Sequence, residues 1–560
     1  MHSKKNHLSL KKGLLIIILG FTGLTSLAQP LSGKIQFTRQ DTLRGSITPE
    51  RSWWDVRHYD ITVDADLEHQ TISGVNIIKF ATTAPGQRLQ LDLQQPMNIV
   101  EAKMNGINIP FERDGNVYFL NFPEALEDGK TYSLEVKFSG KPRKAANPPW
   151  DGGWIWKKDK EGNPFVSVAC QGLGASVWYP NKDHQSDEPD EGARLTIITP
   201  SYLVGVGNGR LKEIKELPGG KKSFTWEVTN PINNYNIIPY IGNYVSWNTV
   251  FKGEKGNLDC SFYVLKHNEK SAKEQLRQTD SMLKAFEYWF GPYPFYEDGF
   301  KIVESPHLGM EHQSAVAYGN NYRNGYLGRD LSGTGWGLKF DFILVHEAGH
   351  EWFGNNITSK DIADMWVHEG FTNYSESLYL DYYFGKDAAS AYVRGTRAGI
   401  RNDIPIIGIF GVNHEGSGDM YSKTGNLLHM IRRIIGNDNQ FRAILRGMNR
   451  DFYHTTVNGT DVIEYFNRHS GKNFTPVFNQ YLHTVKIPVL EYEIKGHTIR
   501  YRWTNCNDDF NMPVIIHAGK EFILYPVTQW KEETLKDADF SALRVDPDFY
   551  ISSKRVSPVK

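Results

Sequence analysis

Phe342-Ile-Leu-Val-His346-Glu347-Ala-Gly-His350 is the most informative run in this 560-residue chain. Two histidines four residues apart lie on one face of a helix, so both imidazoles can reach the same metal ion. Glu347 lies beside them and can accept a proton from a water molecule at that ion. The helix is otherwise apolar, and charged groups in such surroundings are costly unless they are paired or bind metal. The run therefore predicts a metal-binding helix, and a surface helix with two unrelated histidines is the alternative.

A hydrolytic zinc site needs a third protein ligand and one position left open for water. Glu369, within the run Met365-Trp-Val-His-Glu-Gly-Phe-Thr372, is the next strong candidate, with eighteen residues between it and His350. A loop at residues 358–361 can fold a second helix back so that Glu369 meets the histidines. The alternative is a carboxylate on a helix surface, which the apolar neighbours of Glu369 disfavour.

These residues also carry a resemblance to a known family. The pattern His346-Glu347-x-x-His350-x18-Glu369 resembles the zinc signature of the M1 family of metallo-aminopeptidases, in the gluzincin group. Upstream, Gly309-Met310-Glu311-His312 resembles the Gly-x-Met-Glu-Asn exopeptidase motif of that family. The resemblance is dense from about residue 170 to residue 485.

Two further segments add to the resemblance. Tyr421-Ser-Lys423 is similar to the catalytic tyrosine segment of the family, and Gln171 is similar to the glutamine that helps to hold the substrate amine. Three positions depart from the family pattern. His312 and His368 stand where asparagine is usual, and Lys423 is followed by Thr424-Gly425 rather than directly by glycine.

The resemblance implies a zinc-dependent aminopeptidase with one Zn²⁺ per chain, bound by His346, His350 and Glu369. Glu347 would act as general base, and Tyr421 would stabilise the oxyanion. The residues that the resemblance places on the substrate side are Glu311 and Gln171, which would receive the α-ammonium group, with Gly309 and Met310 beside them.

Glu376 is a further candidate for the substrate side. It follows Glu369 by seven residues and therefore lies on the same helix face. It would either assist amine binding or orient a metal ligand.

Two other functions stay open at this point. The first is a zinc endopeptidase or another zinc hydrolase, which would lack the preference for a free N-terminus. The second is a non-catalytic peptide-binding relative, for which a lost catalytic residue would be the signature. None is lost here.

Composition narrows the class of protein. Hydrophobic residues make up 40% of the chain, which excludes disorder as its main property. The 63 basic and 64 acidic residues give no support for nucleic-acid binding. The three cysteines are too few for a disulfide framework, and whether any of them pair is left open. We expect peptides with a free N-terminus as the binding partners, and the oligomeric state is left open.

The N-terminus indicates export. Lysines precede an apolar run at Leu14–Leu19, and small residues end at Ala28, which is the pattern of a cleaved signal peptide over residues 1–28. An uncleaved anchor helix is the alternative, but the run is short for a membrane span of about 20 residues. We therefore expect a periplasmic or extracellular protein with no stable membrane insertion after cleavage.

The chain is expected to be a multidomain α+β protein. Alternating apolar residues predict an N-terminal β-sandwich over residues 34–250, and a small C-terminal β-sandwich over residues 487–560. Residues 251–486 would form a thermolysin-like catalytic domain of mixed α/β structure, with no large C-terminal helical domain after it. Helices are expected at 271–290, 338–354, 361–385, 418–436 and 459–469. The acid-rich run 183–190 is expected to be a solvated loop, with cation binding as the alternative.

Overall fold

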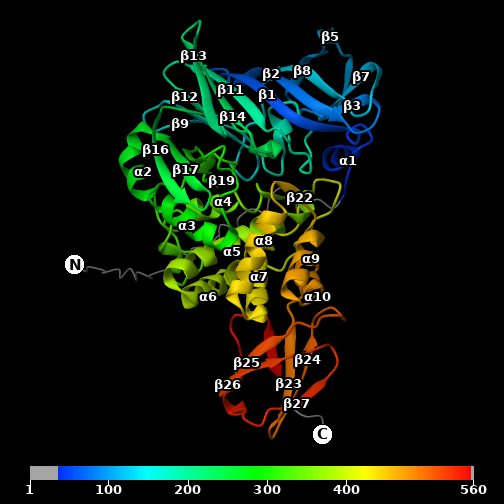
Figure 1. Cartoon of the computed structure of the whole chain (residues 1–560), viewed down its shortest axis with the longest axis vertical. Helices are drawn as coiled ribbons and strands as arrows, with labels where there is room; N and C mark the ends of the chain where they lie inside the picture. Colours follow the sequence, from blue (N-terminus) through cyan, green and yellow to red (C-terminus); the bar gives the residue numbers. More distant parts are fainter. Residues whose placement is uncertain (1–35, 557–560) are drawn as a thin grey trace, which may run out of the picture.

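The computed structural model describes residues 36–556, and the predicted signal peptide lies outside them. Figure 1 shows three regions along the long axis: a β-rich region at the top, a helical region in the middle and a second, smaller β region at the C-terminal end. The predicted fold class is confirmed: a β-rich N-terminal region precedes a mixed α/β region, and residues 489–555 form two small sheets and one short 3-10 helix (Phe540–Ala542). None of the helices in the described part of the chain is long and apolar enough to span a membrane.

An eight-stranded sheet forms most of the N-terminal region. Its strands, in spatial order, are β13 (Arg210–Leu217), β14 (Lys221–Val228), β11 (Ala193–Pro200), β1 (Trp54–Asp66), β2 (Thr71–Thr82), β8 (Thr131–Gly140), β4 (Asn98–Met104) and β5 (Ile107–Asn108). Only β1 and β11 pair in parallel among these neighbours. Residues of β1 alternate between buried and partly exposed, which places Tyr59, Ile61 and Val63 in the core.

Two smaller sheets complete the N-terminal region. One contains β3 (Gly86–Asp92), β7 (Val117–Leu126) and β6 (Phe111–Asp114). The other contains β12 (Val204–Val206), β15 (Tyr240–Gly242), β10 (Pro164–Ala169) and β9 (Gly153–Lys158). A short helix, α1 (Arg39–Gly45), precedes all of these strands.

A five-stranded mixed sheet opens the catalytic region. Its order is β16 (Tyr244–Gly253), β17 (Gly256–Leu265), β18 (Phe300–Glu304), β20 (Val316–Tyr318) and β19 (Gly309–Met310). This sheet begins at Tyr244, so the boundary predicted at residue 250 falls within β16. The other domain limits stay predictions.

The helices that follow pack into one continuous core. They are α2 (Glu269–Gln275), α3 (Gln278–Phe290), α4 (Phe342–Gly349), α5 (Trp366–Phe384), α6 (Lys386–Gly395), α7 (Ser422–Ile435), α8 (Asp438–Asp451), α9 (Gly459–Ser470) and α10 (Thr475–His483). The helix predicted at 271–290 is divided at Leu276 and Arg277 into α2 and α3. The helix predicted at 338–354 is shorter than expected, because a 3-10 helix (Trp336–Leu338) and a bend precede α4 and turns follow it.

The C-terminal region contains two small sheets. Their orders are β27 (Lys531–Thr534), β24 (Thr498–Thr504), β23 (Val489–Lys495) and β29 (Ser552–Arg555), and then β26 (Lys520–Leu524), β25 (Val514–Ala518) and β28 (Arg544–Val545). Their apolar side chains belong to the same core cluster as the helices. The C-terminal β region is therefore packed directly against the catalytic region.

Candidate metal centre and active site

Two consecutive α-helices bring the predicted metal ligands together. His346 and His350 lie on and at the end of α4, and Glu369 lies in the first turn of α5. Glu369 Oε2 is 3.6 Å from His346 Nε2 and 3.3 Å from His350 Nε2. All three side chains are almost fully buried. The ligand atoms therefore converge on one small volume, as the spacing predicts.

The surroundings of these atoms fit a zinc ion. The outer nitrogen of each ring faces an acceptor: His346 Nδ1 lies 2.8 Å from Glu376 Oε1, and His350 Nδ1 lies 3.0 Å from the Phe353 carbonyl oxygen. These acceptors assign the proton to Nδ1, which leaves each Nε2 lone pair directed at Glu369. Among the described residues, Glu369 Oε2 is buried without a hydrogen-bond donor. Two imidazole nitrogens and one such carboxylate are a donor set that suits Zn²⁺.

Hydrogen bonds from aspartate side chains fix the start of α4 and the segment that leads into α5. The buried Asp341 caps α4 by accepting a hydrogen bond from the Leu344 amide, and its other contacts include the Tyr318 hydroxyl. The segment before α5 is fixed by Asp361, which accepts a hydrogen bond from the Ala363 amide. His368 Nε2 accepts a hydrogen bond from the Ser359 amide, so this departure from the family pattern has a structural role.

Glu347 lies next to the metal ligands. Its carboxylate is close to His350 and Glu311, with the candidate ligand atoms of the three residues within 4.8 Å of one another. Burial raises the pKa of Glu347 to about 7. The backbone of Gly309 approaches so closely that a Cβ there would lie 2.6 Å from Glu347 Oε1. A glycine at 309 therefore leaves room for the carboxylate.

Glu311 and Gln171 meet beside Glu369. Gln171 Nε2 donates to Glu311 Oε1 over 2.6 Å and lies 3.5 Å from Glu369 Oε1. Tyr235, which the sequence analysis missed, donates its hydroxyl to the same Glu311 oxygen at 2.8 Å. Burial raises the pKa of Glu311. Met310 precedes Glu311 in the short strand β19.

Tyr421 completes the group around the histidines. It is the residue immediately before α7, and its ring stacks on His346 with the centroids 5.9 Å apart. Lys423 points away from the site and donates to the Thr484 carbonyl. His312 Nδ1 contacts the Tyr240 hydroxyl. His312, which departs from the family pattern, therefore has a structural partner.

Glu376 lies beside His346, one of the predicted metal ligands. Its Oε1 contacts His346 Nδ1, and its Oε2 accepts a hydrogen bond from the Tyr392 hydroxyl at 2.6 Å. It is fully buried. This placement fits the ligand-orienting alternative and not the amine-binding one.

Two other acidic features differ from what the sequence suggests. The run 183–190 is not a solvated loop: Asp183 and Asp187 are buried and pair with Arg44 and Lys182. Glu415 is fully buried, and burial together with the charges of nearby Glu369 and Glu311 raises its pKa to about 8. A glutamate in a Gly-flanked loop offers no sequence signal for such burial.

Comparisons with known proteins identify two family models in the chain. The Peptidase M1 N-terminal domain matches residues 56–235, and the Peptidase family M1 domain matches residues 274–481. Among curated relatives, Aminopeptidase 2 of Candida albicans is 22% identical over 462 residues, covering 79% of this chain and 48% of that protein. Leucyl aminopeptidase of Saccharolobus solfataricus is 20% identical over 521 residues, covering 88% and 62%. The chain thus spans about half to three fifths of these relatives.

Solved structures show the same fold. A mutant M1 zinc metallopeptidase from Deinococcus radiodurans superposes with a TM-score of 0.66 at 19% identity, covering 79% of this chain and 97% of the other. The same TM-score and coverage are found for that mutant bound to a Tyr-Ser-Ala substrate. A two-domain M1 zinc metallopeptidase mutant bound to L-tryptophan gives a TM-score of 0.64 at 20% identity, with coverage of 76% and 94%.

Proposed function

The chain belongs to the M1 peptidase family, and we propose that it is a zinc-dependent aminopeptidase that removes the N-terminal residue from peptides. The observation that carries the proposal is the placement of a zinc-type ligand set, a buried carboxylate and the Gln171–Glu311 pair around one volume. The aminopeptidase names of the relatives and the Tyr-Ser-Ala complex of a structural neighbour support a peptide substrate.

His346, His350 and Glu369 would hold the zinc ion. When bound, the ion supplies Lewis-acid chemistry, which polarises the carbonyl of the scissile bond and lowers the pKa of water to about 7. Glu376 and the Phe353 carbonyl hold the two imidazoles in the orientation that this requires.

Glu347 is the general base of the proposed reaction. It takes the proton from the attacking water and delivers it to the nitrogen of the leaving amine. Tyr421, stacked on His346, donates a hydrogen bond to the carbonyl oxygen as negative charge develops on it.

Glu311 and Gln171 select for a free N-terminus. The Glu311 carboxylate pairs with the α-ammonium group, while the Gln171 amide oxygen accepts a second hydrogen bond from it. This anchoring places only the first peptide bond beside Glu347, so one residue is removed in each reaction.

We also propose that the protein acts outside the cytoplasm, in a periplasm or in the extracellular medium. The support is the basic and apolar run within residues 1–28, which ends at small residues. Mass spectrometry of the purified protein tests this, since a mature N-terminus at Gln29 is expected and an intact Met1 would contradict it.

The catalytic part of the proposal is tested by Glu347→Gln. The variant keeps the volume of the side chain but cannot accept the proton, so it should bind one zinc per chain and fail to hydrolyse peptides. Metal content and peptide turnover are measured on the same sample. Full activity in this variant would remove Glu347 from the mechanism.

A further inference from the structure

Helix α1 lies outside the part of the chain that the family models match, because it ends at Gly45 and the match begins at residue 56. It is nevertheless firmly attached to the N-terminal region. Gln40 Nε2 donates to Asp114 Oδ1 at 2.8 Å, and Gln90 Nε2 donates to the Leu43 carbonyl at 2.9 Å. The helix therefore has a fixed position from which it can act on its other neighbours.

One neighbour of α1 is the turn that carries Gln171. Arg44 pairs with Asp183 at 3.3 Å, and its Nε lies 3.5 Å from the Leu173 carbonyl oxygen. The guanidinium also packs against Gly174, where a Cβ would lie 2.3 Å from Arg44 Nη2. Arg44 thus packs against the turn formed by residues 171–174.

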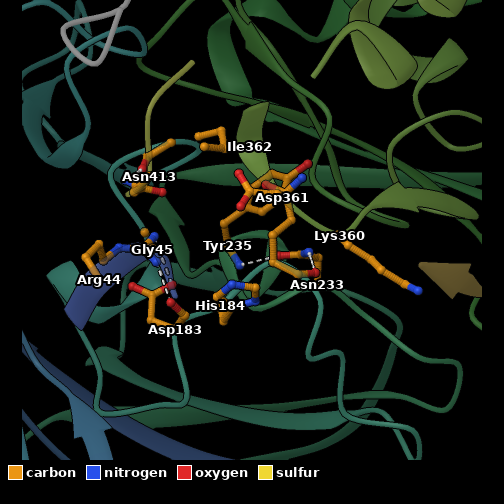
Figure 2. Close-up of a pocket in the computed structure, with 13 residues that line it drawn as sticks. Arg44, Gly45, Asp183, His184, Asn233, Tyr235, Lys360, Asp361, Ile362 and Asn413 are labelled. Carbon is orange, nitrogen blue, oxygen red and sulfur yellow. Dashed lines mark hydrogen bonds and ion pairs between the residues drawn. The ribbon is translucent and has the colours of Figure 1, made fainter. Parts of the chain in front are cut away.

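The other neighbour is the loop formed by residues 411–414. A Cβ on Gly45 would lie 2.1 Å from the Asn413 backbone nitrogen, so the two backbones are in direct contact. Asn413 Nδ2 in turn donates to the Gly172 carbonyl at 2.9 Å. Asp361 fixes the same loop to the catalytic region by accepting a hydrogen bond from the Gly411 amide. Figure 2 shows Arg44, Gly45, Asp183 and Asn413 around one pocket, with Tyr235 close by.

We propose that α1 is a positioning element of the amine-binding site: Arg44 and Gly45 hold the 171–174 turn against the 411–414 loop and so set the place of Gln171 relative to Glu311. The inference rests on the proposed function. It adds that a segment outside the matched domains controls recognition of the free N-terminus.

The size of the effect follows from the geometry of hydrogen bonds. The Gln171–Glu311 contact is 2.6 Å long, and a displacement of the turn by about 1 Å would take such a bond out of its useful range. Recognition that depends on this contact should then weaken by about tenfold or more. Interactions at the metal ligands, which belong to α4 and α5, should not change.

The test uses Gly45→Ala, which adds one methyl group between α1 and the Asn413 backbone. The matched control is Gly399→Ala, because a Cβ at Gly399 would meet no atom within 4 Å. Two competitive inhibitors are compared on the zinc-loaded enzyme: L-leucine hydroxamate and isocaproic hydroxamate, its counterpart without the α-amine. Both carry the same metal-binding group, and only the first can use Glu311 and Gln171.

We expect Gly45→Ala to weaken the binding of L-leucine hydroxamate by about tenfold and the binding of isocaproic hydroxamate by less than about twofold. Gly399→Ala should bind both inhibitors as the wild type does. Equal weakening of both inhibitors, or no change in either, would overturn the inference. If the Gly45 variant does not fold, Arg44→Ala is measured in the same way and should show the same selective loss. A wild-type enzyme that binds both inhibitors equally would instead show that the amine site of the proposed function is wrong.

Discussion

Gln171 Nε2 donates a hydrogen bond to Glu311 Oε1 over 2.6 Å, which joins two residues separated by 140 positions in the chain. Gln171 belongs to a turn of the N-terminal region, and Glu311 follows the edge strand of the catalytic sheet. The proposed amine-binding site is therefore built between two regions, whereas the proposed metal ligands come from the consecutive helices α4 and α5 and the residue that ends α4. Substitutions in the two sets should have separable effects.

Glu311→Gln should reduce kcat/KM on peptides with a free N-terminus by about a hundredfold. The substitution removes the charge that pairs with the α-ammonium group but keeps the size of the side chain. Initial rates over a range of peptide concentrations measure the effect. Glu304→Gln is the matched control, because Glu304 is also a buried carboxylate and contacts Leu265, Asn268 and Tyr322 instead of the site. Equal losses in both variants would contradict the assigned role.

Glu376→Gln should weaken zinc binding by about ten- to a hundredfold. The carboxylate orients His346 through Nδ1, and partners of this kind have effects of that size on metal affinity. Competition with a coloured chelator measures the affinity directly, without reference to turnover. Glu287→Gln serves as the control, since Glu287 is buried but contacts Tyr293 and Tyr296. Unchanged zinc affinity together with a raised KM would return Glu376 to the amine-binding role.

Tyr421→Phe should lower kcat by roughly a hundred- to a thousandfold and change KM little. The hydroxyl is proposed to stabilise charge that develops only in the transition state, so its removal should leave ground-state binding intact. Tyr374→Phe removes a buried hydroxyl that contacts His429 and provides the comparison. A large rise in KM with unchanged kcat would show that Tyr421 binds substrate instead.

Asp548 should make the stability of the folded protein depend on pH. It links the C-terminal β region to the helices, with Oδ1 at 3.2 Å from Arg394 Nη1 and Oδ2 at 3.4 Å from His429 Nε2. Burial alone would raise its pKa, but the contact with His429 and the charges of Arg394 and Arg433 outweigh burial and lower the pKa from 3.8 to about 2. The lowered pKa corresponds to a contribution of about 2 kcal/mol to the free energy of unfolding.

The sign of this dependence follows from the lowered pKa. The contribution is present above pH 3.8 and is lost as the pH falls through about 2. Asp548→Asn should therefore lower the thermal midpoint at pH 7, and its difference from the wild type should shrink between pH 4 and pH 2. A difference that stays constant over this range would show that Asp548 does not act through its charge.

The candidate metal ligands could be predicted because the pattern that identifies them lies within one short stretch of sequence. Two histidines at helical spacing, and an acid with eighteen residues between it and the second histidine, form that pattern, and the structure brings the three side chains together. Helix α8, which is absent from the predicted helices, also has a sequence signal: Asn437 caps it, and Phe441, Ile444, Leu445 and Met448 follow at helical spacing.

The remaining features depend on contacts between distant segments. Tyr235 reaches Glu311 only because two regions pack together, and no pattern around Tyr235 indicates this. The acidic run at 183–190 looks solvated in sequence because its partner Arg44 lies 139 positions before Asp183. Lys182 directly precedes the run, but its contact with Asp187 does not follow from helical or strand spacing. Helix α1 has too few apolar residues to show a period, with only Leu43 and Gly45 buried.

The most direct measurement compares peptides that differ only at the N-terminus. The zinc-loaded protein is given one peptide panel with free amines and the same panel acetylated, with and without a chelator, and the products are identified by mass. Stepwise loss of N-terminal residues, from free peptides only and without chelator only, is the expected result. Internal cuts, or equal cleavage of acetylated peptides, would contradict the aminopeptidase assignment.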